Sequence, residues 1–384
     1  MRLLLRESPR NSYLPHVEQR EVIIIGAGLA GLTAATELAR GGRDVLVLEK
    51  HHLPRHKVCG EYLSLEVVPH LSALGIPLAD APRIEKFLLC SSRNSQVRSR
   101  LDPGGVGISR HALDYRVYQA ALKAGVTFRW DPVEKVRFEQ GRFLVFSRDK
   151  TFKANQVLGA WGKRSSLDRA LERPFFKASG PWLGIKMHYR ASYPSDQVGL
   201  YAFKGGYGGL SVTETGAVNF CYLIHRDRFR DTPSLETCTT KLLEEHPSLQ
   251  EVLDGAEPLF GQALSISNVY FGKKELCRDH VLMSGDAARL IHPLSGNGMA
   301  MAIRTGSLQA GLVEQFLSGA LSDRKALETA YRHLWKKEFG PRLRVSAWLQ
   351  GLLTNPKRME LGIQLATRSP FLLRKLIRKT HGRL

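Results

Sequence analysis

The sequence predicts an α/β protein with an inserted antiparallel β-sheet domain and a C-terminal helical segment, and three observations lead to this fold class. Residues 21–50 contain a β-branched run, a glycine turn, an Ala/Leu-rich run and a second apolar run, the order strand–turn–helix–strand of a parallel sheet. Residues 174–271 are rich in aromatic and β-branched residues, which is typical of antiparallel strands. Residues 281–306 contain a buried strand, a Pro/Gly-rich loop and a helix of small residues.

The glycine motif Gly26-Ala-Gly28-Leu-Ala-Gly31 lies between the first strand and the first helix and predicts a Rossmann-like dinucleotide site. Gly26 makes the tight turn, Gly28 lets the backbone approach a pyrophosphate, and Gly31 lets the helix pack closely on the sheet. The free N–H groups at the start of the helix favour phosphate. Glu49 follows the second strand, where an acid holds ribose hydroxyls, and Lys50 is predicted beside it at the same site.

A basic loop follows from His51 to Glu61. Its Pro, Gly and clustered bases predict either a solvated loop or a cap in which cations such as Lys57 face cofactor oxygens. Nearby cations lower the pKa of a thiol, so Cys59 is a weak candidate for a catalytic residue. An isolated Cys is more often a small packing residue, and we favour that structural interpretation of Cys59.

Ser109 predicts the N-cap of a further helix whose first turn contains Arg110. A cation in the first turn is unfavourable with the helix dipole. Arg110 therefore either has an anionic partner or is a simple surface arginine.

The second strong motif extends from Val281 to Gly306. A buried strand ends in Gly285-Asp286, and a Pro/Gly-rich loop then opens a helix at Met299. An Asp at a strand end can hold a polyol chain, and a helix N-terminus can stabilise negative charge on a ring. A reduced flavin needs both features, whereas NAD explains them poorly. An ordinary strand, loop and helix is the alternative interpretation.

Three segments, Gly26–Glu49, the loop Arg55-His-Lys57-Val-Cys59-Gly60-Glu61 and Gly285–Gly306, resemble the flavoprotein superfamily of p-hydroxybenzoate hydroxylase, and more closely its geranylgeranyl reductase branch. The resemblance implies a GR2-type FAD-binding domain, FAD as cofactor and NAD(P)H as transient reductant. It also implies that Arg110 lies by the FAD diphosphate, that Asp286 binds the ribityl chain and that residues 296–299 line the isoalloxazine edge. The predicted cofactor-binding residues are Gly26, Gly28, Gly31, Glu49, Lys50, Lys57, Arg110, Asp286, Pro293, Gly296, Gly298 and Met299.

The hydroxylases carry an Asp-Gly pair where this chain has Trp161-Gly162. That Asp helps to hold FAD and nicotinamide phosphates in the family, so this departure leaves three interpretations open. Lys163 and Arg164 compensate for the missing acid, the reductant differs, or Trp161 only packs locally. The expected parts of the chain are a leader (1–19), a discontinuous FAD-binding domain (20–81, 102–173 and 272–318), a β-rich substrate domain (82–101 and 174–271) and a basic helical segment (319–384).

Composition sets outer limits on the class of protein. Apolar residues make up 43% and charged residues 24% of the 384 positions, as in a folded globular protein. No apolar run reaches the roughly 18 residues of a transmembrane helix. The five cysteines are scattered and form no CxxC pair, which favours reduced thiols in a cytoplasm and predicts no metal site.

The C-terminal segment concentrates the positive charge. Residues 331–384 contain thirteen Lys and Arg and two Glu, so they carry +11 of the net +20. We expect helices over 321–335, 342–353 and 371–379, the last two basic and amphipathic. They either lie peripherally on an anionic membrane or pack on the body with a solvated basic face. Nucleic-acid binding is not expected, because no reader motif accompanies the charge.

These patterns predict an enzyme, an FAD-dependent oxidoreductase acting on a hydrophobic small molecule that is phenolic or an isoprenoid lipid. Oxygen insertion by a monooxygenase whose flavin is reduced by NAD(P)H is the first hypothesis. Hydride delivery to a polyprenyl double bond is the second, and the 293–306 pattern favours it. A non-catalytic FAD- or lipid-binding regulator is the third, with Trp161 as its main support.

Overall fold

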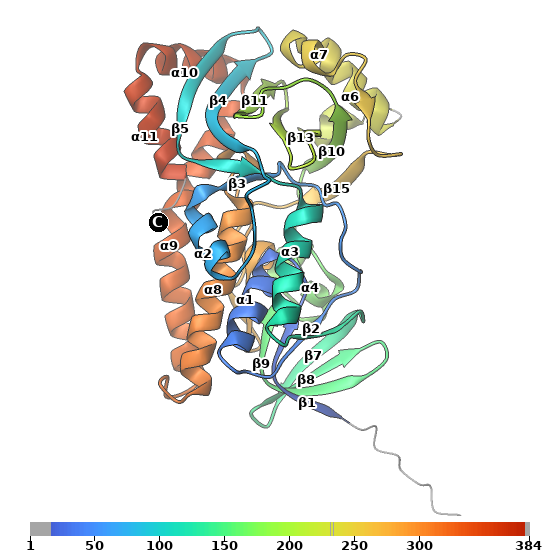
Figure 1. Cartoon of the computed structure of the whole chain (residues 1–384), viewed down its shortest axis with the longest axis vertical. Helices are drawn as coiled ribbons and strands as arrows, with labels where there is room; N and C mark the ends of the chain where they lie inside the picture. Colours follow the sequence, from blue (N-terminus) through green and yellow to red (C-terminus); the bar gives the residue numbers. More distant parts are fainter. Residues whose placement is uncertain (1–16, 231, 233, 381–384) are drawn as a thin grey trace, which may run out of the picture.

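The computed structural model in Figure 1 describes residues 17–230, 232 and 234–380. Two β-sheets lie one above the other in this view, and helices cover them. The lower sheet has eight strands, and its main path runs β16-β17-β9-β1-β2-β6; β8 also pairs with β9, and β7 pairs with β8. Its strands are β1 (Glu18–Ile25), β2 (Val45–Leu48), β6 (Thr127–Arg129), β7 (Val133–Glu139), β8 (Arg142–Ser147), β9 (Thr151–Gly159), β16 (Cys277–Arg278) and β17 (Val281–Met283).

The upper sheet has nine strands in the order β14-β10-β13-β12-β11-β4-β5-β3, with β15 paired to β10. It is mostly antiparallel, although β4 and β11 run parallel. The fold class expected from the sequence is confirmed. The strands are β3 (Tyr62–Ser64), β4 (Arg83–Ser91), β5 (Gln96–Gly107), β10 (Trp182–Arg190), β11 (Gln197–Phe203), β12 (Gly206–Val212), β13 (Val218–His225), β14 (Glu257–Pro258) and β15 (Leu264–Val269).

The helices form three groups around these sheets. The first group packs on the lower sheet, the second on the upper sheet, and α9 to α11 form the C-terminal segment. The first comprises α1 (Leu29–Arg40), α2 (Val68–Ala73), α3 (Arg110–Lys123), α4 (Ser166–Ala170) and α8 (Gly298–Leu317). The second comprises α5 (Arg226–Phe229), α6 (Leu235–Glu244) and α7 (Pro247–Leu253). The C-terminal helices are α9 (Arg324–Leu353), α10 (Pro356–Arg368) and α11 (Pro370–Thr380).

Several boundaries differ from the sequence expectations. The strand β3 belongs to the upper sheet, although its residues lie in the segment assigned to the FAD-binding domain. Residues 324–353 form one helix that continues through Pro341, where a break was expected, and α10 was not expected as a separate helix. The expected leader overlaps β1 by residues 18–19, and its first sixteen residues lie outside the described residues. Within the described residues no helix is both long and apolar enough to cross a membrane.

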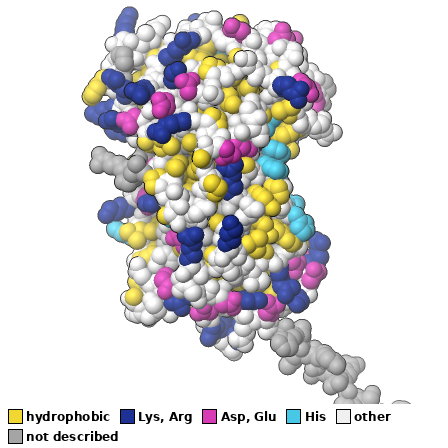
Figure 2. Space-filling view, viewed as in Figure 1, with side chains coloured by type: hydrophobic (Ala, Val, Ile, Leu, Met, Phe, Trp, Pro, Cys, Tyr) yellow, Lys and Arg dark blue, Asp and Glu magenta, His cyan; other side chains and the backbone are white. Residues whose placement is uncertain are grey.

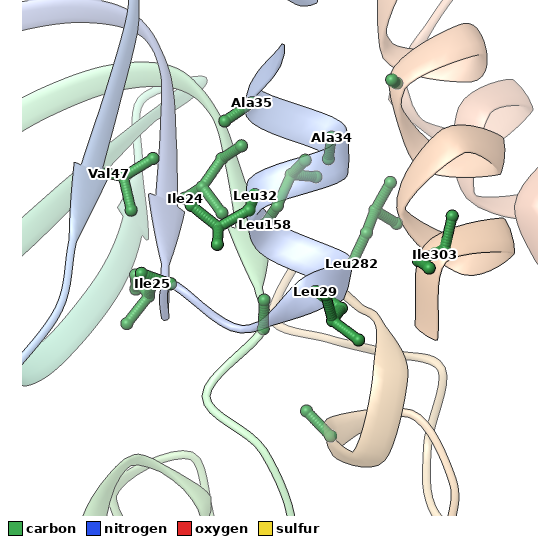
Figure 3. Packing of buried hydrophobic residues seen from close by; sticks show 14 of the residues in the cluster. Ile24, Ile25, Leu29, Leu32, Ala34, Ala35, Val47, Leu158, Leu282 and Ile303 are labelled. Carbon is green, nitrogen blue, oxygen red and sulfur yellow. The ribbon is translucent and has the colours of Figure 1, made fainter. Parts of the chain in front are cut away.

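The core of the lower domain brings together two distant segments of the chain, residues 21–50 and residues 281–306. Figure 3 shows Ile24, Leu32 and Leu158 packed between the sheet and α1, with Leu282 and Ile303 approaching from the later segment. All five are buried completely. The parallel neighbours of β1 are β2 and β9, and β17 pairs with β9. The two sequence motifs, about 250 residues apart, are therefore built on one sheet.

Helices α1 and α8 approach so closely that glycine is required at their contact. A Cβ added to Gly306 of α8 would lie 2.3 Å from the carbonyl oxygen of Ala30 in α1. Gly311, five residues further along α8, has no atom within 4 Å of such a Cβ and is exposed.

We therefore expect Gly306→Ala to destabilise the protein by about 1–3 kcal/mol, because the two helix backbones must separate. The matched control Gly311→Ala should leave the stability unchanged or raise it by up to about 1 kcal/mol. Urea unfolding measures both. Equal effects of the two variants would contradict the close helix contact.

Candidate active site

The Gly26–Gly31 turn has the shape of a phosphate cradle. Gly26 has a φ of +111°, and a Cβ there would lie 2.4 Å from the carbonyl oxygen of Ala160. A Cβ on Gly31 would lie 2.1 Å from the carbonyl oxygen of Gly26, so α1 packs directly on the turn. The space around Gly28, in contrast, holds no atom within 4 Å of an added Cβ. A pyrophosphate can therefore approach the backbone there.

The carboxylate of Glu49 lies at this turn. Its Oε2 accepts the Ala27 N–H at 2.8 Å, and its Oε1 accepts the His51 N–H at 3.1 Å. Glu49 reaches the glycine turn because β1 and β2 are parallel, and the carboxyl ends of parallel strands meet at one edge of the sheet. Lys50 is exposed next to it.

The second motif lies beside the first turn of α1. Gly285 has a φ of +53° and its N–H donates to Thr305 Oγ1 at 3.0 Å. A Cβ on Gly285 would lie 3.1 Å from the Cβ of Ala30. Asp286, the next residue, is thereby placed within the same site as the glycine turn.

The loop before α8 is shaped by a second tight approach. Gly296 has a φ of +63°, and a Cβ there would lie 2.9 Å from the ring of Tyr62. Pro293 opens this loop as an exposed residue, Gly298 begins α8, and Met299 is buried in its first turn.

The N-termini of α1 and α8 are open to a bound group. Neither Gly28 nor Asn297 caps its helix with a side chain. Side chains cap α3, α6, α9 and α10, whereas the short helices α2 and α7, each with Pro in its first turn, also lack such a cap. The first N–H groups of a helix need acceptors, so phosphate at α1 and a ring carbonyl at α8 fit these two ends.

Arg110 and Lys57 share one buried acid. Asp114, fully buried one turn after Arg110, accepts Arg110 Nε at 2.7 Å and Nη2 at 2.8 Å, and it pairs with Lys57 Nζ at 2.6 Å. Burial would raise the pKa of Asp114, but the two cations outweigh it and hold that pKa below its usual range. Asp114 is thus the anionic partner that the helix dipole required for Arg110. The charge of Asp286 contributes, after that of Asp114, to raising the pKa of Arg110.

The loop of residues 57–61 is fixed to the upper sheet by side chains from three strands. Lys186 of β10 donates to the Lys57 carbonyl at 3.3 Å, and Asn219 of β13 donates to the Cys59 carbonyl at 3.2 Å. Ser211 of β12 donates to the carbonyl of the next residue, Gly60, at 3.0 Å. A loop of the nucleotide domain is therefore held on one face of the second sheet.

Glu61 completes this attachment and is fully buried. Its carboxylate pairs with Lys186 Nζ at 2.5 Å and His188 Nε2 at 2.6 Å, and it accepts the Arg110 N–H at 2.8 Å. Burial would raise the pKa of Glu61, but the His188 hydrogen bond and the Lys186 charge outweigh it and lower that pKa. Sequence reasoning did not single out Lys186 or His188. The available signal was a series of bases at alternate positions, Lys186, His188 and Arg190, in a mostly apolar strand.

Glu61 and His188 also form, with His56, the one group of potential metal ligands within the described residues. Their ligand atoms lie within 4.8 Å of one another. Lys186 already neutralises the Glu61 carboxylate, and a second cation beside that ammonium is electrostatically unfavourable. We therefore propose no metal at this group.

Cys59 lies on the loop that the upper sheet holds. Its sulfur accepts the Glu61 N–H at 3.5 Å, its carbonyl accepts the Asn219 side chain of β13 at 3.2 Å, and its side chain is half-buried. Burial raises the pKa of Cys221 to about 12, so Cys221 stays protonated. The structure leaves the catalytic role of Cys59 as a prediction.

Four aromatic residues of the strands β11, β12 and β13, Phe203, Tyr207, Phe220 and Tyr222, lie on opposite faces of the upper sheet. Tyr207 lies on the face toward the second motif, where its hydroxyl accepts the Leu294 N–H at 3.2 Å. Phe203, Phe220 and Tyr222 pack instead in the cluster under α6 and α7. Of the four, Tyr207 alone joins the site.

Trp161 has a polar partner. Its indole N–H donates to Asp168 Oδ1 at 3.0 Å, and the same oxygen pairs with the buried Arg173 at 2.7 Å. Arg164 donates to the carbonyls of Phe176 and Ala178 and lies over the Phe176 ring. Trp161 is thus part of a local hydrogen-bonded network.

Comparison with known proteins identifies the cofactor. Residues 21–56 match the family model described as FAD binding domain. The chain is 27% identical over 389 aligned positions to a menaquinone reductase of Mycolicibacterium smegmatis, covering 93% of this chain and 90% of the relative. It is 24% identical to a digeranylgeranylglycerophospholipid reductase of Haloferax volcanii, covering 87% and 85%. The chain is an FAD-dependent oxidoreductase related to the geranylgeranyl reductases.

Solved structures confirm the fold of this oxidoreductase. The flavin-dependent brominase Bmp2 superimposes with a TM-score of 0.79 at 19% identity, covering 94% of this chain and 93% of that protein. PqsL, a probable FAD-dependent monooxygenase from Pseudomonas aeruginosa, gives a TM-score of 0.73 at 19% identity, covering 90% and 99%. The open cradle at Gly28 and the two uncapped helix ends fit FAD in this fold.

A double-mutant cycle tests the Glu61–Lys186 attachment. We expect Lys186→Met to destabilise the protein by about 3 kcal/mol or more, because it leaves a buried carboxylate without its cation. Adding Glu61→Gln should recover most of that loss in urea unfolding, because the buried charge is then gone. Additive effects of the two substitutions would contradict the pairing.

Two partly buried histidines, His56 and His292, make the stability of the protein depend on pH. Burial first, and neighbouring cations second, lower the pKa of both His56 and His292 to about 4. In the unfolded chain these rings titrate near 6.5. Between pH 6.5 and 4 the unfolded state therefore binds more protons, and stability falls as the pH is lowered through this window.

We expect His56→Gln/His292→Gln to show a shallower loss of urea midpoint between pH 7 and pH 5 than the wild type. The matched control is His333→Gln, because His333 is exposed. An unchanged slope in the double variant would contradict the burial of neutral rings.

Proposed function

We propose that the chain uses reduced FAD to saturate double bonds in an isoprenoid lipid. The observation that carries this proposal is an apolar cluster between the upper sheet and the last two helices, here called the covered apolar cluster. It contains Val97, Ala202, Tyr207, Leu223, Val269, Leu290, Met359, Ile363 and Leu373. Its member Leu290 belongs to the same loop as Pro293, and Tyr207 bonds to Leu294. An apolar substrate chain in this layer would end beside the segment predicted to line the flavin.

The relatives support this substrate class. The digeranylgeranylglycerophospholipid reductases are named for a phospholipid with geranylgeranyl chains, and the menaquinone reductases for a quinone. These similarities extend over more than four fifths of this chain. They favour double-bond reduction over the oxygen insertion that the sequence analysis placed first.

Saturating a carbon–carbon double bond requires one hydride and one proton. FAD, when bound and reduced, supplies the hydride, and we propose NAD(P)H as the reductant. The chain's own part is to hold the double bond in a water-free layer and to supply the proton. Cys59 is our candidate for that proton, because its loop is hydrogen-bonded through Asn219 to the face of the upper sheet that carries Tyr207, and its thiol is half-buried there.

Oxygen insertion into a hydrophobic or phenolic substrate is the second candidate function. The likeness to a probable FAD-dependent monooxygenase favours it, although that likeness concerns the fold. A non-catalytic regulator is the third. It loses its main support, because the Trp161–Asp168 hydrogen bond gives Trp161 a structural role.

Product analysis distinguishes these functions. The flavin-loaded protein is incubated with a geranylgeranyl lipid or a phenol, anaerobically and in air, with NADH, NADPH or dithionite. We expect the anaerobic samples to add one H₂ per double bond of the lipid. A hydroxylated product formed only in air would replace this proposal with the monooxygenase. No product with any reductant would leave the regulator.

The placement of Asp286 predicts a change in flavin content. Asp286→Ala should weaken FAD binding about 10- to 100-fold, the loss expected for one hydrogen bond to a charged group. The ratio of flavin to protein absorbance after gel filtration measures this. The exposed Asp254 of the upper domain offers the control Asp254→Ala, which should keep full flavin content. Full flavin content in Asp286→Ala would remove Asp286 from the site.

A further inference from the structure

The last two helices have an inner and an outer face of different character. On the inner face, Met359, Ile363 and Leu373 are buried in the covered apolar cluster. Glu360, the single acid between residues 356 and 380, also turns inward and accepts the Ser91 hydroxyl at 2.5 Å. The inner face therefore covers the proposed substrate layer.

The outer face exposes large apolar side chains. Phe371 is 66% exposed, Trp348 at the end of α9 is 60% exposed, and Leu361 and Leu365 are each 56% exposed. These four are the most exposed large apolar side chains in the part of the chain that the structure describes. Leu361 and Leu365 lie one turn apart on α10 and so form a stripe.

Cations surround these apolar side chains. On α10, Arg358 precedes the leucine stripe by three residues and Arg368 follows it by three, and all four side chains are exposed. In Figure 2 the dark-blue Lys and Arg side chains gather at the upper left, where Figure 1 places α10 and α11. The exposed bases of this face are Arg344, Lys357, Arg358, Arg368, Arg374, Lys375, Arg378 and Lys379. Arg378 is paired with Asp102.

We propose that this outer face, here called the docking face, binds an anionic membrane surface and admits the isoprenoid chain beneath α10 and α11. A nucleic acid would use the bases and would stack on Trp348 and Phe371, but it would leave the exposed Leu361–Leu365 stripe without a role. An anionic bilayer binds both kinds of side chain, because its acyl region buries the apolar side chains and its phosphates pair with the cations. The membrane part of the proposal stands on the docking face alone. The entry of the substrate chain rests on the proposed function.

Vesicle flotation tests the docking face directly. Wild-type protein should float with vesicles of phosphatidylcholine and phosphatidylglycerol and bind vesicles of phosphatidylcholine alone at least about tenfold more weakly. Leu361→Glu/Leu365→Glu/Phe371→Glu should lower binding to the anionic vesicles about tenfold or more. The matched control is Leu122→Glu, which places the same charge at an exposed leucine of α3 and should bind as the wild type. Circular dichroism and flavin content show that each variant is folded.

Turnover separates this inference from the proposed function. The triple variant should saturate a short isoprenoid alcohol in detergent as the wild type does, but lose at least about tenfold of its activity on a geranylgeranyl lipid embedded in anionic vesicles. Flotation that is equal for the triple variant and the wild type would overturn the docking face. If wild-type protein floats but saturates neither substrate, the proposed function and chain entry fail, while membrane binding by the docking face is upheld.

Discussion

The buried carboxylate of Glu61 joins the two halves of the protein. Glu61 belongs to the nucleotide domain, whereas its partners Lys186 and His188 belong to β10 of the upper sheet. A fully buried carboxylate is stable only when cations and hydrogen-bond donors surround it. This requirement fixes where the upper sheet lies relative to the glycine turn, and it also fixes the loop that carries Cys59. Together with the Asn219 and Ser211 hydrogen bonds, this ionic cluster holds the nucleotide domain against one face of the upper sheet.

The two faces of the upper sheet carry different kinds of side chain. One face packs Phe203, Phe220 and Tyr222 under α6 and α7, which is ordinary core. The other face carries Lys186, Asn219 and Ser211 where it holds the nucleotide-domain loop. Further along the same face, Tyr207 and Leu223 enter the covered apolar cluster. The polar contacts to the nucleotide-domain loop and the covered apolar cluster thus share one face of the upper sheet.

The sequence predicted the nucleotide half of the fold because its signals are local. The strand, the Gly26–Gly31 turn, the helix and Glu49 are adjacent in the chain, and each glycine has a backbone reason that the structure bears out at Gly26 and Gly31. The FAD assignment also followed from a local pattern at Asp286 and is confirmed by the family match. The roles of the individual cofactor-binding residues remain predictions.

The rest depends on contacts between residues far apart in the chain. Nothing local in the sequence shows that Glu61 meets Lys186 and His188 more than 120 residues later. Periodicity also could not tell which face of the upper sheet Tyr207 and Phe220 occupy relative to the cofactor, because both faces are apolar. The helix through Pro341 was missed since proline usually ends a helix, and here the packing of Phe339 and Leu343 in the core outweighs that preference.

A crystal structure of the FAD-loaded protein tests the central claim most directly. The account predicts the diphosphate at the N-terminus of α1 and the ribityl chain at Asp286. It further predicts that the flavin ring contacts the backbone of residues 296–299, between the Cys59 loop and the covered apolar cluster. A flavin ring that lies away from residues 296–299, or that faces the α6 and α7 side of the upper sheet, would contradict it.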